Sequence, residues 1–343
     1  MRKLLNTLFV TSDDLYLSLE NGNIEAWKGK EKAAQIPLIN LENILDFSHK
    51  GASPALLGEC VKRGIGFCFL TPNGRFLARA CGVAEGNIFL RKEQYRISDD
   101  EEKSLIIARA MITGKILNAR SVLMRARRDH PLSVDKDLFR SHIKELQNAA
   151  ACAAQASGLD ELRGIEGNGA QSYFSLLDSL ILQDKKHFYF RGRSKRPPLD
   201  RMNAILSFTY TILAHDCASA LEAAGLDPYA GFLHRDRPGR DSLALDLMEE
   251  LRSVYADRFA LTLVNNRILS SKNFEIKEDG AVWLNGEGRK ILLNQWQERK
   301  RDTITHPFLQ EKMAWGLIPY VQALLLARYI RHDLDGYPPF FWK

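Results

Sequence analysis

The chain of 343 residues lacks the features that define several large classes of protein. It has no run of about 18 apolar residues, and the best candidate, 204–213, leads directly into His215 and Asp216, so no membrane span is predicted. Five cysteines (Cys60, Cys68, Cys81, Cys152 and Cys217) are odd in number, widely spaced and without a CxxC pair. They predict neither a disulfide framework nor a zinc site, and a cytoplasmic location fits them best.

Repeats of 20 to 50 residues and low-complexity tracts are also missing from the sequence. The amino-terminal apolar run is broken by Asp13 and Asp14 without a small-residue cleavage site, so we interpret it as a first β-strand and not as a signal peptide. With 45% hydrophobic and 26% charged residues, and 48 Lys and Arg against 42 Asp and Glu, the composition is that of a globular protein with net charge +6. The length indicates about two domains.

Residues 1–95 show short apolar runs separated by turn dipeptides. Breaks typical of hairpins occur at Asn21-Gly22, at 28–29 and at Pro72-Asn73-Gly74. One helical pattern, 54–62, interrupts the runs and is closed by Gly64. This part is therefore predicted to be an antiparallel β domain with one helix.

After residue 95 the apolar period changes to that of helices. Ser98, followed by three acidic residues, predicts the start of a long helix over 99–129. Further helices are expected near 134–157, 168–184, 201–224, 242–262 and 307–331, with one short hairpin over 274–276 and 282–284. The predicted fold class is α+β, with the β domain (1–95) followed by a larger all-α domain (96–343).

The segment Gly164-Ile165-Glu166-Gly167-Asn168-Gly169 precedes an apolar helical stripe. Glycines at a helix start can cradle phosphate, but the dinucleotide fingerprint fails, because Ser172 stands where a third glycine is needed and no strand pattern precedes it. Glu166 would then lie at the amino end of a helix. It either complements the helix dipole or, with glycine on both sides, projects its carboxylate toward a ligand, which we favour.

A second candidate locus joins His234, at the end of Gly231-Phe-Leu-His234, to a helix expected to begin at an N-cap, Ser242. One face of that helix carries Asp246, Glu249, Glu250, Ser253 and Asp257. Such a face is most often a solvated one, and a lone histidine is most often a packing residue. One histidine with two or three carboxylates nevertheless suits a hard divalent ion, Mg²⁺ or Mn²⁺, better than zinc.

The triplet His234-Arg235-Asp236 matches two unrelated catalytic motifs. A kinase needs a glycine-rich loop, a catalytic lysine and an Asp-Phe-Gly in the right order, which the sequence lacks. A non-haem iron oxygenase needs a second histidine, for which His306 is the candidate, and usually a β-barrel. Neither interpretation is favoured.

A basic segment lies between the two candidate loci. Seven Lys or Arg residues fall within 185–201 against one acid, Asp200, and aromatic residues Phe188, Tyr189 and Phe190 lie among them. Charge runs are usually solvated loops, but this one could neutralise phosphates while an aromatic ring stacks on a base. The expected DNA-binding residues are Lys185, Lys186, Arg191, Arg193, Lys195 and Arg196.

Three blocks in this order resemble the CRISPR-associated endonuclease family that integrates new spacers. They are Gly-Ile-Glu166-Gly-Asn-Gly-Ala-x-x-Tyr-Phe, then Arg196-Pro-Pro-Leu-Asp200-x-x-Asn203-Ala-x-Leu-Ser-Phe, then Gly231-Phe-Leu-His234 with Ser242-Leu-x-x-Asp246-Leu-x-Glu249. The resemblance spans essentially the whole chain, and the turn from His234 to Arg240 looks like forms found in type I systems.

The resemblance implies a metal site made by Glu166, His234 and Glu249, with Asp246 as an auxiliary acid beside it; whether Asp246 or Glu249 is the direct ligand stays open. It also implies a metal-dependent DNA endonuclease and integrase that acts by phosphoryl transfer on double-stranded DNA. A homodimer formed through the β domain and a small ferredoxin-like CRISPR-associated partner are implied too. Without the resemblance, the alternatives are a non-catalytic DNA-binding scaffold and a small-molecule metalloenzyme that depends on Asp236.

Overall fold

The structure is a computed structural model that describes residues 6–72, 76–80 and 88–342, and it confirms the α+β class. The chain forms two compact units. The first comprises Met1–Gly86, Leu284–Asp302 and Ala314–Leu317, and the second comprises Asn87–Trp283, Thr303–Met313 and Ile318–Lys343. The boundary expected near residue 95 lies inside helix α2 (Ile88–Ser98), which belongs to the second unit.

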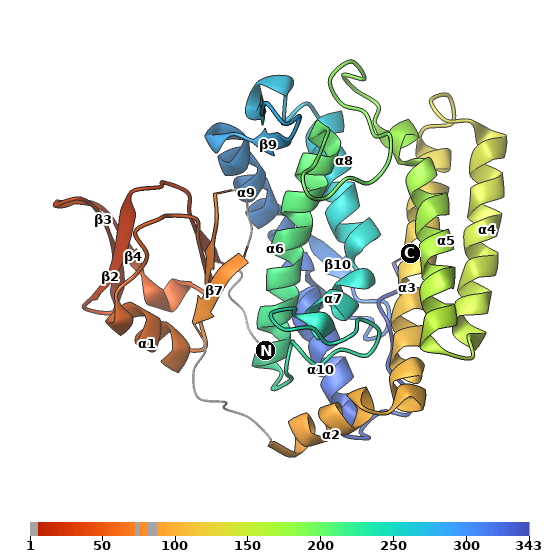
Figure 1. Ribbon diagram of the computed structural model, residues 1–343, viewed down its shortest axis with the longest axis horizontal. Coiled ribbons are helices and arrows are strands. Elements are labelled where there is room, and N and C mark those ends of the chain that lie inside the picture. Colours follow the sequence, from red (N-terminus) through yellow and green to blue (C-terminus); the bar gives the residue numbers. More distant parts are fainter. Residues whose placement is uncertain (1–5, 73–75, 81–87, 343) are drawn as a thin grey trace. The chain divides into compact units, whose positions relative to one another are not determined.

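Two sheets form the β part of the first unit (Figure 1). Strands β2 (Leu15–Glu20), β3 (Asn23–Lys28) and β4 (Glu31–Pro37) make the predicted antiparallel meander. In the four-stranded sheet, of order β1-β5-β6-β7, β1 and β6 both run parallel to β5, and only β6 and β7 are antiparallel. The bounds of these strands are β1 Thr7–Val10, β5 Asn43–Asp46, β6 Gly66–Leu70 and β7 Phe76–Ala80.

Turn chemistry explains the tight hairpin of the meander. Asn21 and Gly22 both have positive φ, 48° and 75°, which is the conformation that a two-residue hairpin turn requires. The turn predicted at Asn73-Gly74 lies outside the described residues.

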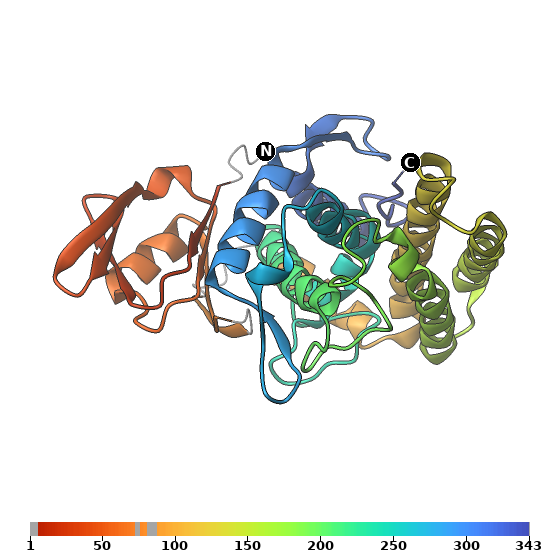
Figure 2. The ribbon, with the colours of Figure 1, turned by 90° about the horizontal axis from the view of Figure 1, so that it is seen from above.

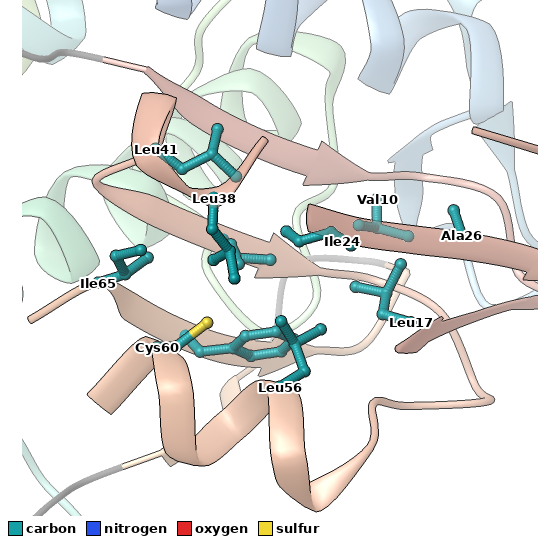
Figure 3. Close-up of a cluster of buried hydrophobic side chains, with 11 residues drawn as sticks. Val10, Leu17, Ile24, Ala26, Leu38, Leu41, Leu56, Cys60 and Ile65 are labelled. Carbon is teal, nitrogen blue, oxygen red and sulfur yellow. The ribbon is translucent and has the colours of Figure 1, made fainter. Parts of the chain in front are cut away.

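The predicted helical insert is α1 (Pro54–Lys62), which begins at Ser53, whose side chain accepts a hydrogen bond from the Leu56 amide. Figure 3 shows Leu56 and Cys60 of this helix facing the apolar side chains of the strands. The cluster consists of Val10, Leu17, Ile24, Ala26, Leu38, Leu41, Ile44, Leu56, Cys60, Ile65 and Phe67. Burial of this apolar set fixes the helix on the sheets.

Helix α9 (Gly286–Arg301) returns to the first unit and was not predicted from the sequence. Asn285 caps it by accepting from the Gly288 amide at 2.9 Å. The side chain of Gln297 accepts from the Thr7 amide at 3.3 Å, so α9 contacts strand β1. Its apolar residues are few among many charges, which is why no helical stripe was recognised.

The second unit is mainly helical. Figures 1 and 2 show α3, α4 and α5 side by side, which agrees with their contacts. The helices of this unit, besides α2, are α3 Glu101–Asp129, α4 Lys136–Gln155, α5 Leu159–Ser175, α6 Arg201–Ala223, α7 Ser242–Glu249, α8 Arg258–Asn265 and α10 Ile318–Ile330. Its short strand pairs are β8 Phe274–Ile276 with β9 Val282–Leu284, the predicted hairpin, and β10 Thr303–Thr305 with β11 Lys312–Ala314, which was not predicted.

The helix expected near 168–184 is α5, which runs from Leu159 to Ser175 and is followed by a short 3₁₀ turn, Leu177–Leu180. Two further helix limits are wrong for local reasons. The long helix α3 begins after Asp100, whose carboxylate accepts from the Lys103 amide, and not after Ser98, which ends α2. The last helix begins at Ile318 and not near 307, because 303–305 and 312–314 pair as strands.

Helix α6 alone, within the described residues, has the length and apolar composition that could cross a membrane. Its apolar window is 72% buried inside the protein, as in the core helix of a globular unit. The packing of α7 and α10 against α6 accounts for this burial.

The carboxyl-terminal segment, 337–342, docks inside the second unit. The buried carboxylate of Glu250 accepts hydrogen bonds from the Tyr337 hydroxyl and from the Phe340 amide. Burial raises the pKa of Glu250 to about 7, although these donors act in the opposite direction. Asn118 of α3 donates to the Phe340 carbonyl at 2.7 Å and accepts from the Trp342 amide at 2.8 Å. The apolar tail is thus part of the core of its own helical unit.

Phe340→Ala is expected to lower the free energy of unfolding by about 3–5 kcal/mol, because a fully buried ring is replaced by a cavity. Phe341, the neighbouring residue, is 37% exposed and provides the matched control, Phe341→Ala, with a loss below about 1 kcal/mol. Urea unfolding followed by circular dichroism measures both. A loss below about 1 kcal/mol for Phe340→Ala as well would show that the docked tail does not stabilise the helical unit.

Candidate functional site

Three helices of the second unit bring charged side chains to one point. Lys115 lies on α3, Glu166 on α5 and Glu249 at the end of α7. The ammonium nitrogen of Lys115 contacts Glu166 Oε1 and lies 2.6 Å from Glu249 Oε2. The Lys115 side chain is only 13% exposed and that of Glu249 only 5%, so this is a largely buried ion-pair cluster.

Glu166 lies in the interior of α5, and its predicted place at a helix amino end is wrong. The helix begins at Leu159, because tertiary packing compensates for the low helix propensity of the glycines. Of these glycines, only Gly169 packs closely: a Cβ there would lie 3.4 Å from Ile116 of α3. At Gly164 and Gly167 a Cβ would meet nothing within 4 Å, so the surface beside Glu166 is left open.

The acidic face of α7 and the residues after it is buried, so the interpretation as a solvated face is wrong. Asp246, Glu249 and Glu250 are at most 4% exposed, and Ser253 and Asp257 are equally buried. After α7 the chain continues through a π-helical turn, Arg252–Asp257, into α8. Such turns are frequent at functional sites. Here Arg252 lies on the turn, and its guanidinium lies 2.9 Å from Glu249 Oε1.

Asp246 holds the loop that carries His234 in place through hydrogen bonds. Its Oδ2 accepts hydrogen bonds from the amides of Phe232 and Leu233, at 2.7 and 3.0 Å. Its Oδ1 accepts from the His234 amide at 3.0 Å and lies 2.5 Å from His234 Nδ1. A carboxylate accepts the Nδ1 proton, so the arrangement selects the tautomer whose Nε2 keeps a free lone pair.

Close packing and a second anchor hold the same loop. A Cβ on Gly231 would lie 2.8 Å from the Ser242 Cβ and 3.0 Å from Asp246 Oδ2, so only glycine fits there. From the other side, Arg163 of α5 donates to the Leu233 carbonyl at 2.8 Å. Arg163 precedes Glu166 by three residues and therefore shares its helix face. Ser242 is the first residue of α7 and not its N-cap, which is Asp241.

The electrostatics of Glu249 show that two cations act on one carboxylate. Burial raises the pKa of Glu249, but the charges of Arg252 and Lys115 outweigh burial and lower this pKa to about 2. The group is therefore ionised at neutral pH. Arg252 also interacts electrostatically with Glu166, so the expected metal-site residues lie in one electrostatic neighbourhood.

The donor set fits a divalent ion in its chemistry. Two carboxylates and an imidazole with a free Nε2 are ligands that Mg²⁺ and Mn²⁺ accept. Among the described residues, no three His, Cys, Asp or Glu groups lie close enough together in this structure to hold an ion. Both oxygens of Asp246 accept N–H donors of the loop, whereas those of Glu249 contact the side-chain cations Lys115 and Arg252, so Glu249 is the better candidate for a direct ligand.

The iron-oxygenase interpretation of His234-Arg235-Asp236 receives no support. Asp236 is exposed on the loop. Both ring nitrogens of His306 are engaged, Nε2 with Gln322 at 3.0 Å and Nδ1 with the Leu309 amide at 3.2 Å.

The basic segment divides into exposed and internal residues. Lys185, Lys186, Arg191, Lys195 and Arg196 are exposed, although Lys185 forms an ion pair with Asp178. Arg193 is used inside the protein, where it donates to Asn203 at 2.8 Å and to Ser207 at 3.0 Å. Phe188 and Phe190 are buried, so the expectation that they stack on bases is wrong, and Tyr189 remains as the candidate.

Lys195 connects this basic segment to the carboxylate cluster. Desolvation lowers its pKa, the nearby Arg252 and Arg193 charges lower it further, and Glu249 raises it. The acids are thus surrounded by cations that the sequence alone did not single out, among them Lys115 and Arg252. Neither has a local motif: each lies in an ordinary helical pattern, and only the packing of distant helices reveals the role.

Comparison with known proteins identifies the family. The family model described as CRISPR associated protein Cas1 matches residues 8–298. A relative from Chlorobaculum tepidum, named CRISPR-associated endonuclease Cas1 1, is 48% identical over 343 residues, which is 100% of both chains.

Solved structures share the fold. A Cas1 protein from Thermotoga maritima has a TM-score of 0.82 at 24% identity and covers 98% of this chain and 100% of its own. A casposase bound to integration product has a TM-score of 0.81 at 19% identity, covering 98% and 94%. A Cas6-RT-Cas1–Cas2 complex has a TM-score of 0.80 at 20% identity, covering 98% of this chain and 36% of that chain. From the family match and the full-length relative, this chain belongs to the CRISPR-associated Cas1 family.

Proposed function

We propose that this chain is a metal-dependent DNA endonuclease and integrase that inserts short DNA fragments as new spacers into a CRISPR array. The observation that carries the proposal is the cluster of Glu166 and Glu249 beside His234, whose ring is oriented by Asp246. The name of the relative from Chlorobaculum tepidum and the casposase product complex support the activity.

In this proposal Glu166, His234 and Glu249 hold Mg²⁺ or Mn²⁺. When bound, the ion polarises a phosphodiester and stabilises the charge that develops on its oxygens. Asp246 is a positioning residue, because it fixes the imidazole tautomer and the loop but directs both oxygens at N–H donors. Arg252 keeps Glu249 ionised and in place through its guanidinium.

The reaction is an exchange of phosphodiester bonds. The 3′-hydroxyl oxygen of the incoming fragment attacks phosphorus and its proton passes to solvent, while the bond from phosphorus to the leaving 3′-oxygen breaks and that oxygen takes up a proton from solvent. With water as the attacking group the same site acts as a nuclease. No general base among the side chains is required by this scheme.

Double-stranded DNA is the proposed substrate, held by the exposed residues of the basic segment. We expect the exposed cations Lys186, Arg191 and Arg196 to contact backbone phosphates, and such contacts carry no sequence information. Tyr189, with the Arg191 guanidinium 5.1 Å from its ring centroid, is the aromatic residue available to a base. Action on DNA places the protein in the cytoplasm.

A homodimer through the β unit and a small ferredoxin-like partner complete the proposal. Strand β4 lies at an edge of the meander with most of its side chains exposed, and an edge strand is suited to pairing with another chain. The similar complex that contains Cas1 and Cas2 supports a small CRISPR-associated partner. Assignment to a type I system rests on the His234–Arg240 turn alone.

A non-catalytic DNA-binding scaffold is the second candidate, since the basic segment alone would account for it. The buried carboxylates distinguish the two, because a scaffold has no need to keep ionised acids in its interior at the cost of desolvation.

Glu166→Gln, His234→Ala and Glu249→Gln are each expected to abolish strand transfer and nicking, at least about a hundredfold, while DNA binding changes only a few-fold. The assay uses labelled DNA with Mg²⁺ or Mn²⁺, a chelator control, and the partner protein added or omitted. The matched control is Asp236→Asn, on the same loop, which should retain activity. Products that survive in all three variants would refute the assigned site, and an equal loss in Asp236→Asn would show that the effect is not specific to the three assigned residues.

Asp246→Asn is expected to slow strand transfer about 10- to 100-fold, because the amide cannot accept all the N–H donors that orient His234. It should also lower the free energy of unfolding by about 3 kcal/mol, the scale of lost hydrogen bonds to a buried charge. Rates and urea unfolding are measured side by side. A variant with normal rate and normal stability would show that this carboxylate does not position the loop.

The triple variant Lys186→Gln, Arg191→Gln, Arg196→Gln is expected to weaken DNA binding and to reduce the slope of log K against log salt by about 1 for each phosphate that is no longer neutralised. The control removes three cations from α4, Lys136, Arg140 and Lys144, which are also exposed. Fluorescence anisotropy over a salt series measures both. If the control matches the triple variant, net charge and not the basic segment governs binding.

A further inference from the structure

We propose that Lys115 is an internal competitor of the divalent ion: its ammonium group binds the same two carboxylates, and it leaves them when the ion binds. The inference rests on the proposed function, because it takes Glu166 and Glu249 to be ligands. The residues of α5 and α7 bind the ion in the proposed function. The inference adds a residue of α3 that weakens this binding.

The geometry of the three groups carries the proposal. Lys115 Nζ contacts Glu166 Oε1 and lies 2.6 Å from Glu249 Oε2. One cation therefore bridges two carboxylates that come from different helices and are far apart in the chain. A second cation on the same two oxygens would meet the ammonium group at van der Waals contact or closer, so the two cannot be bound together.

Burial makes the bridge necessary. The side chains of Lys115 and Glu249 are 13% and 5% exposed, so water screens their charges poorly. Two neighbouring carboxylates in such surroundings repel each other unless a cation lies between them. The second cation in contact with Glu249, Arg252, lies on its other oxygen, Oε1, and leaves Oε2 to Lys115.

The lysine side chain can move without a change in the helices. Its flexible four-carbon stem allows the ammonium to leave the carboxylates while the backbone of α3 stays in place. The guanidinium of Arg252 is more restrained, because it also lies over the Tyr210 ring, with the centroid at 5.2 Å. Lys115 is accordingly the cation that yields to the metal ion.

Removing the competitor should tighten metal binding. Mn²⁺ affinity is measured by electron paramagnetic resonance of free Mn²⁺, with full-length protein, for the wild type, Lys115→Met and Lys115→Gln. The dissociation constant of both variants is expected to fall about tenfold or more, because the ion no longer displaces a bound charge. Thermal melts with and without Mn²⁺ should show a larger metal-induced shift in the variants than in the wild type.

Lys195→Met is the matched control. Lys195 interacts electrostatically with Glu249 but belongs to the basic segment, and its removal changes the net charge by the same amount. We expect its dissociation constant to fall by less than about threefold, the effect of a more distant charge. An equal gain in Lys195→Met would overturn the proposal, since general charge and not occupancy of the carboxylates would then set the affinity.

The double variant Glu166→Gln, Glu249→Gln separates the two proposals. If the double variant loses Mn²⁺ binding but the Lys115 variants bind Mn²⁺ no more tightly than the wild type, the competition is overturned and the metal site stands. Retained Mn²⁺ binding in it overturns the assigned metal site and the competition together.

Labelling of the wild type tests displacement without any substitution. Reductive methylation followed by peptide mass spectrometry reports the reactivity of the Lys115 amine. The proposal expects slow labelling of Lys115 without divalent ion and faster labelling when Mg²⁺ is added, with Lys136 as an exposed reference whose rate stays constant. Slow labelling under both conditions would contradict it.

Discussion

The candidate site depends first on the hydrogen bonds that a single buried carboxylate accepts. Asp246 is fully buried, and its carboxylate accepts hydrogen bonds from the amides of Phe232, Leu233 and His234 and from the His234 ring. These bonds turn an irregular loop into a fixed support for an imidazole. Because an uncompensated buried charge is costly, the loop and the start of α7 can hardly separate without loss of stability. The histidine is thereby held in one tautomer and one orientation.

Opposite charges connect the helices around this loop. Lys115 of α3 lies between Glu166 of α5 and Glu249 of α7, and Arg252 completes the surroundings of Glu249. Arg163, on the face of α5 that carries Glu166, holds the Leu233 carbonyl. The work is thus divided among residue types, since Asp246 and Arg163 position the loop, the two glutamates supply charge, and the cations make their burial tolerable.

The sequence predicted those features that are determined locally. Turn residues such as Asn21 and Gly22 located the first hairpin, and the change of apolar period indicated the passage from strands to helices, although the boundary expected near residue 95 falls inside α2. The three motif blocks predicted Glu166, His234 and Glu249 as site residues, and this assignment stays a prediction. It failed where tertiary packing overrides local preference. Gly164 and Gly167 suggested a helix start but lie within α5, and Phe188 and Phe190, set among cations, belong to the core. Lys115 could not be identified, because its partners are brought to it only by the packing of three helices.

The docked tail has a consequence for the order in which the protein forms during synthesis. Residues 337–342 follow every helix of their unit along the chain, yet they supply the partners of Glu250 and Asn118. Glu250 is the neighbour of Glu249, and it acquires these hydrogen bonds only once residues 337–342 have been synthesised and have docked. During synthesis the acidic residues of the site are therefore present before the contacts that hold Glu250 can form.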